Sequence, residues 1–189
     1  MRLILLGPPG AGKGTQAVRL CDALGVVHVS TGDLLRDAVS RGTELGREAA
    51  SFMDKGNLVP DSLVLALLAE RLAQPDAANG FLLDGFPRNL SQAEALASQL
   101  SADGAVERVV HMRLDDDEIV RRLLSRGRKD DNEEVIRNRL EVYRAETAPL
   151  IEYFSSHGLL RTIDALGSVD EVFARAQDAV QANGAGAGV

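Results

Sequence analysis

A lysine ends a glycine-rich run near the start of the chain, in the segment GPPGAGKGT. Gly7, Gly12 and Lys13 fit the pattern G-x-x-x-x-G-K, in which successive backbone N–H groups form a cradle for an anion and the lysine reaches the β- and γ-phosphates of a nucleotide. A strand-like apolar run precedes the loop and a helical pattern follows it, which would place the cradle at a helix N-terminus. The segment therefore predicts a nucleotide-phosphate site.

A carboxylate follows a second apolar run, in the segment FLLDGFPR. Asp84 would lie at the ligand edge of a sheet and hold Mg²⁺ directly or through water, while Gly85 allows close backbone approach and Arg88 can clamp a phosphate bidentately. An Asp-Gly step alone is a common turn, so its pairing with the first segment is what favours a functional interpretation. In many such loops a magnesium-binding hydroxyl directly follows the lysine, whereas here Gly14 takes that place and Thr15 comes next. We expect metal ligation by the loop to be shifted or to pass through water.

Arginines gather in a third segment, RRLLSRGRKDDNEE, and two more follow it at Arg137 and Arg139. Charged runs on helices are usually solvated faces. Arg126 and Arg128, however, flank Gly127, and such a pair suits a short mobile segment that closes over phosphates and spreads positive charge over a transferring group. We expect the neighbouring acidic residues to hold these arginines when no nucleotide is bound.

A fourth segment, STGDLLR, allows two interpretations. Ser30 or Thr31 can cap the helix that follows, which is a sufficient structural explanation for either residue. Arg36, one helical turn further on, could instead bind a second anion. The segment by itself does not decide between these interpretations.

The elements that must position these groups alternate along the chain. Short apolar runs predict strands at residues 2–6, 26–29, 80–83, 108–112 and 159–163. Helical periodicity is clearest at residues 14–24, 32–41, 61–72, 90–100, 115–125, 133–154 and 169–181. This alternation predicts an α/β fold, with a parallel sheet, helices on both faces and ligands at the carboxyl ends of the strands. We expect the helix over 133–154 to kink or stop near Pro149.

Composition limits the classes of protein to which the chain can belong. Its 189 residues, 45% hydrophobic and 26% charged, predict one compact domain, and a net charge of −7 argues against a general nucleic-acid surface. The single cysteine, Cys21, excludes an intrachain disulfide and a multi-cysteine zinc site. We find no apolar run long enough to span a membrane and no signal peptide, so we expect a cytoplasmic protein. The three histidines show no metal or catalytic-triad spacing and are interpreted as structural or surface residues: His28, His111 and His157.

From residue 1 to about 181 the sequence resembles the adenylate kinases, through the segments GPPGAGKGT, STGDLLR, GNLVPD, DGFPRNLSQAE and RGRKDDNEEVIRNRLEVYRAETAPL. The resemblance implies a P-loop nucleoside monophosphate kinase fold with a five-stranded parallel sheet. It implies Mg²⁺-dependent, reversible phosphoryl transfer from ATP to AMP, giving two ADP. It also implies a single domain over 1–181, with a nucleotide-monophosphate subdomain at 30–59 and a short lid at 125–136, followed by a flexible tail at 182–189. A short lid without cysteines implies no zinc, and short-lid relatives suggest a monomer.

The resemblance also assigns residues to the two substrates. The ATP-binding positions are Gly10, Ala11, Gly12, Lys13, Gly14, Thr15, Arg122, Arg126 and Gly167. The AMP-binding positions are Thr31, Arg36, Asn57, Leu58, Val59, Gly85, Phe86, Pro87, Arg88, Gln92, Arg128 and Arg139. We expect charge stabilisation without a general base, from the catalytic residues Lys13, Arg88, Arg126, Arg128 and Arg139, with Asp84 holding Mg²⁺ through water.

The acceptor nucleotide is the sharper question, because UMP/CMP kinases resemble the same pattern. In those relatives alanine is typical at the position of Thr31 and asparagine at that of Gln92, whereas this chain has the residues seen in adenylate kinases. The longer Gln92 amide can pair with the N6/N1 edge of adenine, which presents a donor beside an acceptor. AMP is therefore the favoured acceptor.

Two other classes stay open at this point. A P-loop regulatory module would need Lys13 and Asp84 but not the second set of arginines, and those arginines argue against it. A purely structural α/β domain would need neither group, and a nucleotide-induced rise in melting temperature would exclude it.

Overall fold

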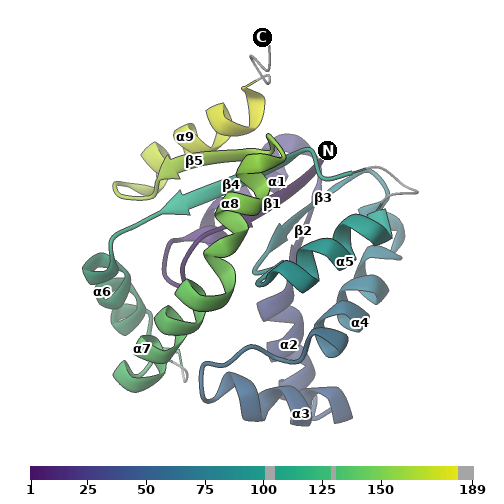
Figure 1. Cartoon of the computed structure of the whole chain (residues 1–189), viewed down its shortest axis with the longest axis vertical. Helices are drawn as coiled ribbons and strands as arrows, with labels where there is room; N and C mark the ends of the chain where they lie inside the picture. The colour runs from purple at the N-terminus through teal and green to yellow at the C-terminus, as the bar shows by residue number, and fades with distance from the viewer. Residues whose placement is uncertain (101–104, 129–130, 183–189) are drawn as a thin grey trace.

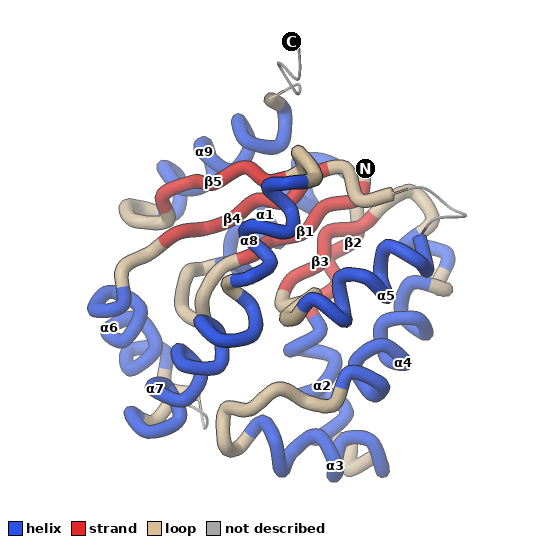
Figure 2. The backbone as a smooth tube through the Cα atoms, in the orientation of Figure 1, coloured by secondary structure: helices blue, strands red, loops and turns tan. Residues whose placement is uncertain are grey.

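The chain folds around a parallel sheet of five strands, drawn in red in Figure 2. The computed structural model describes residues 1–100, 105–128 and 131–182. The strands lie in the order β2-β3-β1-β4-β5, and all four pairings are parallel. Their bounds are Arg2–Leu6 (β1), Val27–Ser30 (β2), Phe81–Asp84 (β3), Arg108–Arg113 (β4) and Leu160–Asp164 (β5). The predicted five-stranded parallel sheet is confirmed.

Helices cover both faces of this sheet. Side chains alternate along β1, so that Ile4 and Leu6 join one hydrophobic cluster and Leu3 and Leu5 join another. The first cluster includes residues of α2 (Thr31–Ser40), α4 (Asp61–Leu72), α5 (Leu90–Leu100) and α8 (Pro149–Ser156). The second includes residues of α1 (Lys13–Leu24) and α9 (Val169–Gln181). In Figure 1, α8 crosses in front of the strands and α1 lies behind them.

Four of the five strands end one residue later than their patterns predict, and two of these ends lie side by side. β2 ends at Ser30 and β3 at Asp84, and the parallel register pairs Asp84 with Ser30 on one side and with Leu5 on the other. Since Leu5 lies just before the glycine-rich loop, the carboxyl edge of the sheet brings three of the predicted segments together.

One helix was missed by the sequence analysis, α3 at Glu44–Met53. The Thr43 side chain caps it by accepting a hydrogen bond from the Gly46 backbone N–H at 3.0 Å. Gly46 lies so close to α2 that a Cβ atom there would come within 2.1 Å of the Ala38 carbonyl oxygen. A glycine in a helix interior weakens the helical pattern, which hid this element.

The predicted break near Pro149 is confirmed. The segment expected as one helix divides into α7 (Glu133–Val142), a π-helical turn at Tyr143–Thr147, and α8. Proline has no backbone N–H, and the ladder changes register just before it, where the Ala148 N–H donates to the Tyr143 carbonyl at 2.8 Å.

The predicted lid begins at the end of α6 (Asp116–Arg126) and continues into α7. Of the predicted lid and tail, residues 129–130 and 183–189 lie outside the described part of the chain. A short 3-10 helix at Pro75–Ala77 completes the elements that the structure describes. Among the helices that it describes, none is long and apolar enough to cross a membrane.

Candidate active site

The glycine-rich loop leads from β1 into α1, as its pattern predicts. Gly10 and Gly12 have φ values of 84° and 89°, in the left-handed region that side-chain-bearing residues rarely adopt. Lys13 is the first residue of α1, and its Nζ donates to the carbonyl oxygens of Gly7 and Pro8 at 2.8 and 2.9 Å. The ammonium group is therefore held inside the curve of the loop, where a phosphate would be cradled.

Burial lowers the pKa of Lys13 to about 8. The carboxylate of Asp84 opposes this shift, whereas the positive charges of Arg88, Arg139 and Arg126 add to it. A lowered pKa means that the ammonium form of Lys13 is less stable here than in water. The negative charge of nucleotide phosphates would stabilise it.

Asp84 ends β3 beside the loop. Its Oδ2 lies 3.7 Å from His28 Nε2, and a Cβ atom added to Gly14 would lie 3.5 Å from the same oxygen. Burial by itself raises the pKa of Asp84, but the neighbouring imidazole of His28 and the positive charges of Lys13 and Arg88 outweigh it and leave this pKa below its ordinary value. The structure thus gives His28, which we had interpreted as structural or surface, a place in the site.

The five residues that we predicted as catalytic line one large cleft. This cleft has a volume of about 740 Å³, within the range of small-molecule sites, and the glycine-rich loop forms part of its wall. Its basic side chains come from α1, α2, α6, α7 and the loops after β3 and α6: Lys13, Arg36, Arg88, Arg122, Arg126, Arg128 and Arg139. This convergence of positive charge on one cleft contrasts with the net charge of −7 of the whole chain.

Arg88 is held in place from three directions. Its Nε donates to the Gly85 carbonyl at 2.8 Å, its backbone N–H donates to Gln92 Oε1 at 2.8 Å, and its carbonyl accepts from Thr147 Oγ1 at 2.7 Å. Burial and the neighbouring charge of Arg139 lower the pKa of Arg88. The Nε bond orients the guanidinium, and the two bonds to the Arg88 backbone hold the loop that carries it.

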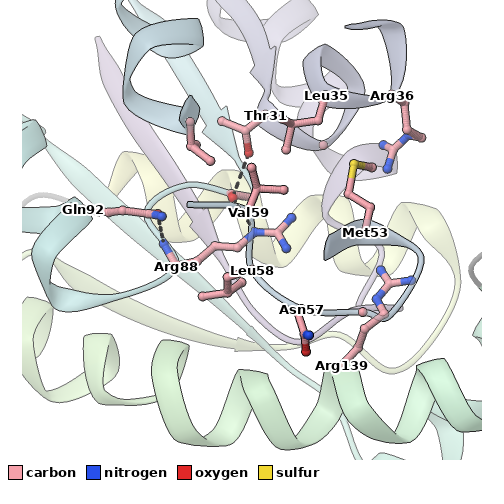
Figure 3. Close-up of a pocket in the computed structure, with 14 residues that line it drawn as sticks. Thr31, Leu35, Arg36, Met53, Asn57, Leu58, Val59, Arg88, Gln92 and Arg139 are labelled. Carbon is pink, nitrogen blue, oxygen red and sulfur yellow. Dashed lines mark hydrogen bonds between the residues drawn. The ribbon is translucent and has the colours of Figure 1, made fainter. Parts of the chain in front are cut away.

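A second pocket adjoins the cleft. Figure 3 shows it between α2, the loop after α3 and the loop after β3, with Arg88 and Arg139 at its edge. It contains nine of the twelve residues that we predicted for AMP: Thr31, Arg36, Asn57, Leu58, Val59, Gly85, Arg88, Gln92 and Arg139. Leu35, Met53 and Val64 add apolar surface that the sequence analysis did not assign to the site.

Three predicted AMP residues lie outside this pocket. Pro87 and Arg128 line the larger cleft, and the side chain of Phe86 is buried in the core with 1% exposure. On the ATP side, Ala11 is also 1% exposed. Neither Phe86 nor Ala11 is among the described residues that line the two cavities, so their predicted ligand contacts remain predictions.

The predicted adenine site for ATP lies where α6 meets the loop after β5. Arg122 donates from Nε to Glu118 at 2.7 Å and from Nη2 to the Ala165 carbonyl at 3.2 Å. Gly167 belongs to the same loop, but it is not among the described residues that line the large cleft. Its predicted backbone contact with the base therefore remains a prediction.

The chain is similar to known proteins over most of its length. The family model for adenylate kinase matches residues 5–159. The chain belongs to the adenylate kinase family. It is 56% identical over 181 residues to an adenylate kinase of Mycobacterium sp. (strain MCS), covering 95% of this chain and 99% of that one. It is 57% identical over 175 residues to an adenylate kinase of Synechococcus sp. (strain WH7803), covering 92% and 95% of the two chains.

An adenylate kinase of this length is of the short-lid type. The chain is a nucleoside monophosphate kinase with the P-loop fold of that family, and its activity is reversible phosphoryl transfer between ATP and AMP. Adenylate kinases in general work on ATP with Mg²⁺ and have ATP, AMP and ADP as substrates. The regulatory and purely structural interpretations are thereby excluded.

Proposed function

We propose that the large cleft binds the phosphates of ATP and that the second pocket binds AMP. The glycine-rich loop and Lys13 hold the ATP phosphates, Arg122 and Gly167 flank its base, and Arg126 closes on its phosphates. The observation that carries this assignment is the junction of the two cavities, because Arg88 and Arg139 line both of them. A group at that junction contacts donor and acceptor phosphates together.

The reaction then depends on the positioning of the two nucleotides and on neutralisation of phosphate charge more than on proton transfer. A phosphate monoester has a second pKa near 6, so at neutral pH the attacking oxygen of AMP is already deprotonated and no general base is required. In the transition state negative charge spreads over the equatorial oxygens of the transferring group. Five of the basic side chains that line the cleft neutralise this charge: Lys13, Arg88, Arg126, Arg128 and Arg139.

The residues present fit a magnesium ion. Mg²⁺ keeps several waters and is usually bound through one or two carboxylates together with substrate phosphates. Asp84 is a carboxylate of this kind, with a lowered pKa, beside the phosphate loop. We propose that Asp84 holds the ion through water and that Thr15, which also lines the cleft, is the nearest loop hydroxyl for it. When bound, the ion would neutralise charge on the ATP phosphates.

Residues 30–59, which include α2 and α3, would form the AMP-binding subdomain, and residues 125–136 would form the lid. α7 already contacts that subdomain, because Asn138 Nδ2 donates to the Lys55 carbonyl at 2.6 Å and to Asn57 Oδ1 at 2.9 Å. The absence of zinc, the monomeric state and the cytoplasmic location remain predictions from the sequence.

The experiment that tests this proposal is a comparison of acceptors. We would measure the initial rate of ADP formation from ATP and Mg²⁺ with AMP, UMP, CMP or GMP as the only varied acceptor. A strong preference for AMP is expected from the Thr31 and Gln92 argument. A preference for UMP or CMP would keep the phosphotransferase mechanism and overturn the assignment of the acceptor pocket.

A further inference from the structure

A carboxylate that the sequence analysis did not assign to the site contacts Gln92. Asp61, the first residue of α4, accepts a hydrogen bond from Gln92 Nε2 at its Oδ1, at 2.7 Å. Asn89 Nδ2 donates to the same carboxylate at 3.0 and 3.3 Å, and Asn89 Oδ1 accepts from the Gln92 backbone N–H at 2.8 Å. Asp61, Asn89 and Gln92 therefore form one network at the back of the AMP pocket.

This network fixes which end of the Gln92 amide is nitrogen and which is oxygen. Gln92 Oε1 accepts from the Arg88 backbone N–H at 2.8 Å, a contact marked by a dashed line in Figure 3. An ionised carboxylate can only accept and a backbone N–H can only donate, so turning the amide over would lose both bonds. Because only 1% of Gln92 is exposed, little water reaches the amide to replace the lost bonds.

The fixed amide is suited to one kind of base. A glutamine amide has two N–H donors and two acceptor lone pairs, and its bonds to Asp61 and Arg88 use one of each. One donor and one acceptor therefore remain for a ligand in the pocket that Gln92 lines. Adenine presents N1 as an acceptor beside the N6 donor, and hypoxanthine presents N1–H as a donor beside the O6 acceptor. The two bases are opposite in pattern and similar in size.

We infer that Asp61 is a positioning residue that sets the preference for adenine by fixing the orientation of the Gln92 amide. This inference rests on the proposed AMP pocket. Asp61 is not among the described residues that line either cavity; it acts through Gln92, whose amide in the opposite orientation would favour hypoxanthine. A carboxylate in the first turn of a helix also stabilises that helix, and this structural role alone would change stability without changing the choice of base.

The test compares AMP with inosine monophosphate as acceptors, with the ratio of their kcat/KM values as the readout. In Asp61→Ala we expect this ratio to fall by about tenfold, the size of effect typical of losing one hydrogen bond to a charged group. Asp61→Asn keeps the size of the side chain and guards against a variant that fails to fold; we expect the ratio to fall in the same direction. KM for ATP should stay within about twofold, because ATP contacts none of this network.

A matched control removes a carboxylate next to the other end of the same helix. Asp76 pairs with Arg71 of α4 at 2.8 Å and is exposed, so Asp76→Ala changes the net charge and the support of α4 without touching Gln92. We expect the ratio for this variant to equal that of the unaltered chain. An equal loss of activity toward both acceptors in the two Asp61 variants, with an unchanged ratio, would overturn the inference in favour of a structural role.

Gln92→Ala separates the inference from the proposal beneath it. If this variant keeps the full preference for AMP over inosine monophosphate, Gln92 does not contact the base, and the inferred role of Asp61 is wrong as well. If Gln92→Ala loses the preference while Asp61→Ala and Asp61→Asn keep it, the base contact stands and only the role of Asp61 is wrong.

Discussion

The carboxylate of Asp131 holds the guanidinium of Arg126 through two hydrogen bonds, from Nε at 2.8 Å and from Nη2 at 2.5 Å. The same carboxylate accepts from the Arg128 backbone N–H at 3.0 Å and from Arg139 Nη1 at 3.4 Å, and its side chain is completely buried. The expectation that neighbouring acidic residues hold the arginines around Gly127 is thus confirmed for Asp131 and Arg126. In the proposed function, Arg126 would exchange this partner for a phosphate.

We expect Asp131→Asn to lower the free energy of unfolding by about 1–2 kcal/mol, because a buried charge-assisted network loses its negative charge and one of its two acceptor oxygens while the arginines keep access to solvent. Burial raises the pKa of Asp131, but Arg126, the Arg128 N–H and Arg139 outweigh it and lower this pKa below its ordinary value. Asp131 therefore stabilises the fold above the pKa of an unfolded aspartate, and this contribution is lost as the pH falls through the lowered folded pKa.

Urea unfolding of the two proteins at pH 7 and at stepwise lower pH measures this difference. The difference in the free energy of unfolding between Asp131→Asn and the unaltered chain should be largest at pH 7 and decrease below about pH 4. Asp116→Asn, at an exposed pair with Arg144, is the control and should change stability by less than about 0.5 kcal/mol. A pH-independent difference between Asp131→Asn and the unaltered chain would contradict the electrostatic explanation.

Lys13 should make ATP binding depend on pH in the alkaline range. Its pKa of about 8 means that the ammonium form, which binds phosphate, becomes scarce as the pH rises above that value. The affinity for ATP should therefore be level below pH 8 and fall by up to about tenfold per pH unit above it. Because the bound phosphates raise the pKa again, binding near pH 8 should take up protons.

Calorimetric titrations with ATP, in buffers of different ionisation enthalpy between pH 7 and pH 9, measure both effects. Lys13→Gln is the matched variant, since it keeps a long polar side chain without a titrating charge. We expect weaker binding with little pH dependence in that variant. If Lys13→Gln kept the pH dependence of the unaltered chain, another group would be responsible.

Removal of the Arg88 guanidinium should act mainly on the chemical step. We expect Arg88→Ala to raise the barrier by about 2–4 kcal/mol, by analogy with the loss of one preorganised oxyanion donor. Arg88→Lys keeps the charge without the bidentate fork and should recover only part of the activity. Steady-state rates with AMP and ATP, together with thermal melting to confirm the fold, check both variants. Near-normal turnover in a folded Arg88→Ala would show that the clamp is not catalytic.

The local parts of this molecule could be predicted from the sequence. The phosphate loop can be predicted because its function depends on backbone conformation, and Gly10 and Gly12 occur where that conformation has a positive φ. Strands β1 and β3 can be predicted because both faces of the sheet are buried there, so each is a nearly continuous apolar run. The edge strand β5 is less apolar, with Arg161 and Thr162 between its apolar residues. α3 was missed because Gly46 weakens the helical pattern, and only its contact with α2 explains that glycine.

The tertiary structure decided which charged and polar side chains meet. Asp131 is one of several carboxylates near Arg126 and Arg128 in the sequence. The packing of α6 against α7 buries this one between Arg126 and Arg139. Asp61 and Gln92 are 31 residues apart, on different helices, and no local pattern joins them. The sequence by itself determined the loop, the strands and the family, because those depend on local backbone preference and hydrophobic period. Partner choice depends on distances between elements, which exist only once the helices have packed on the sheet.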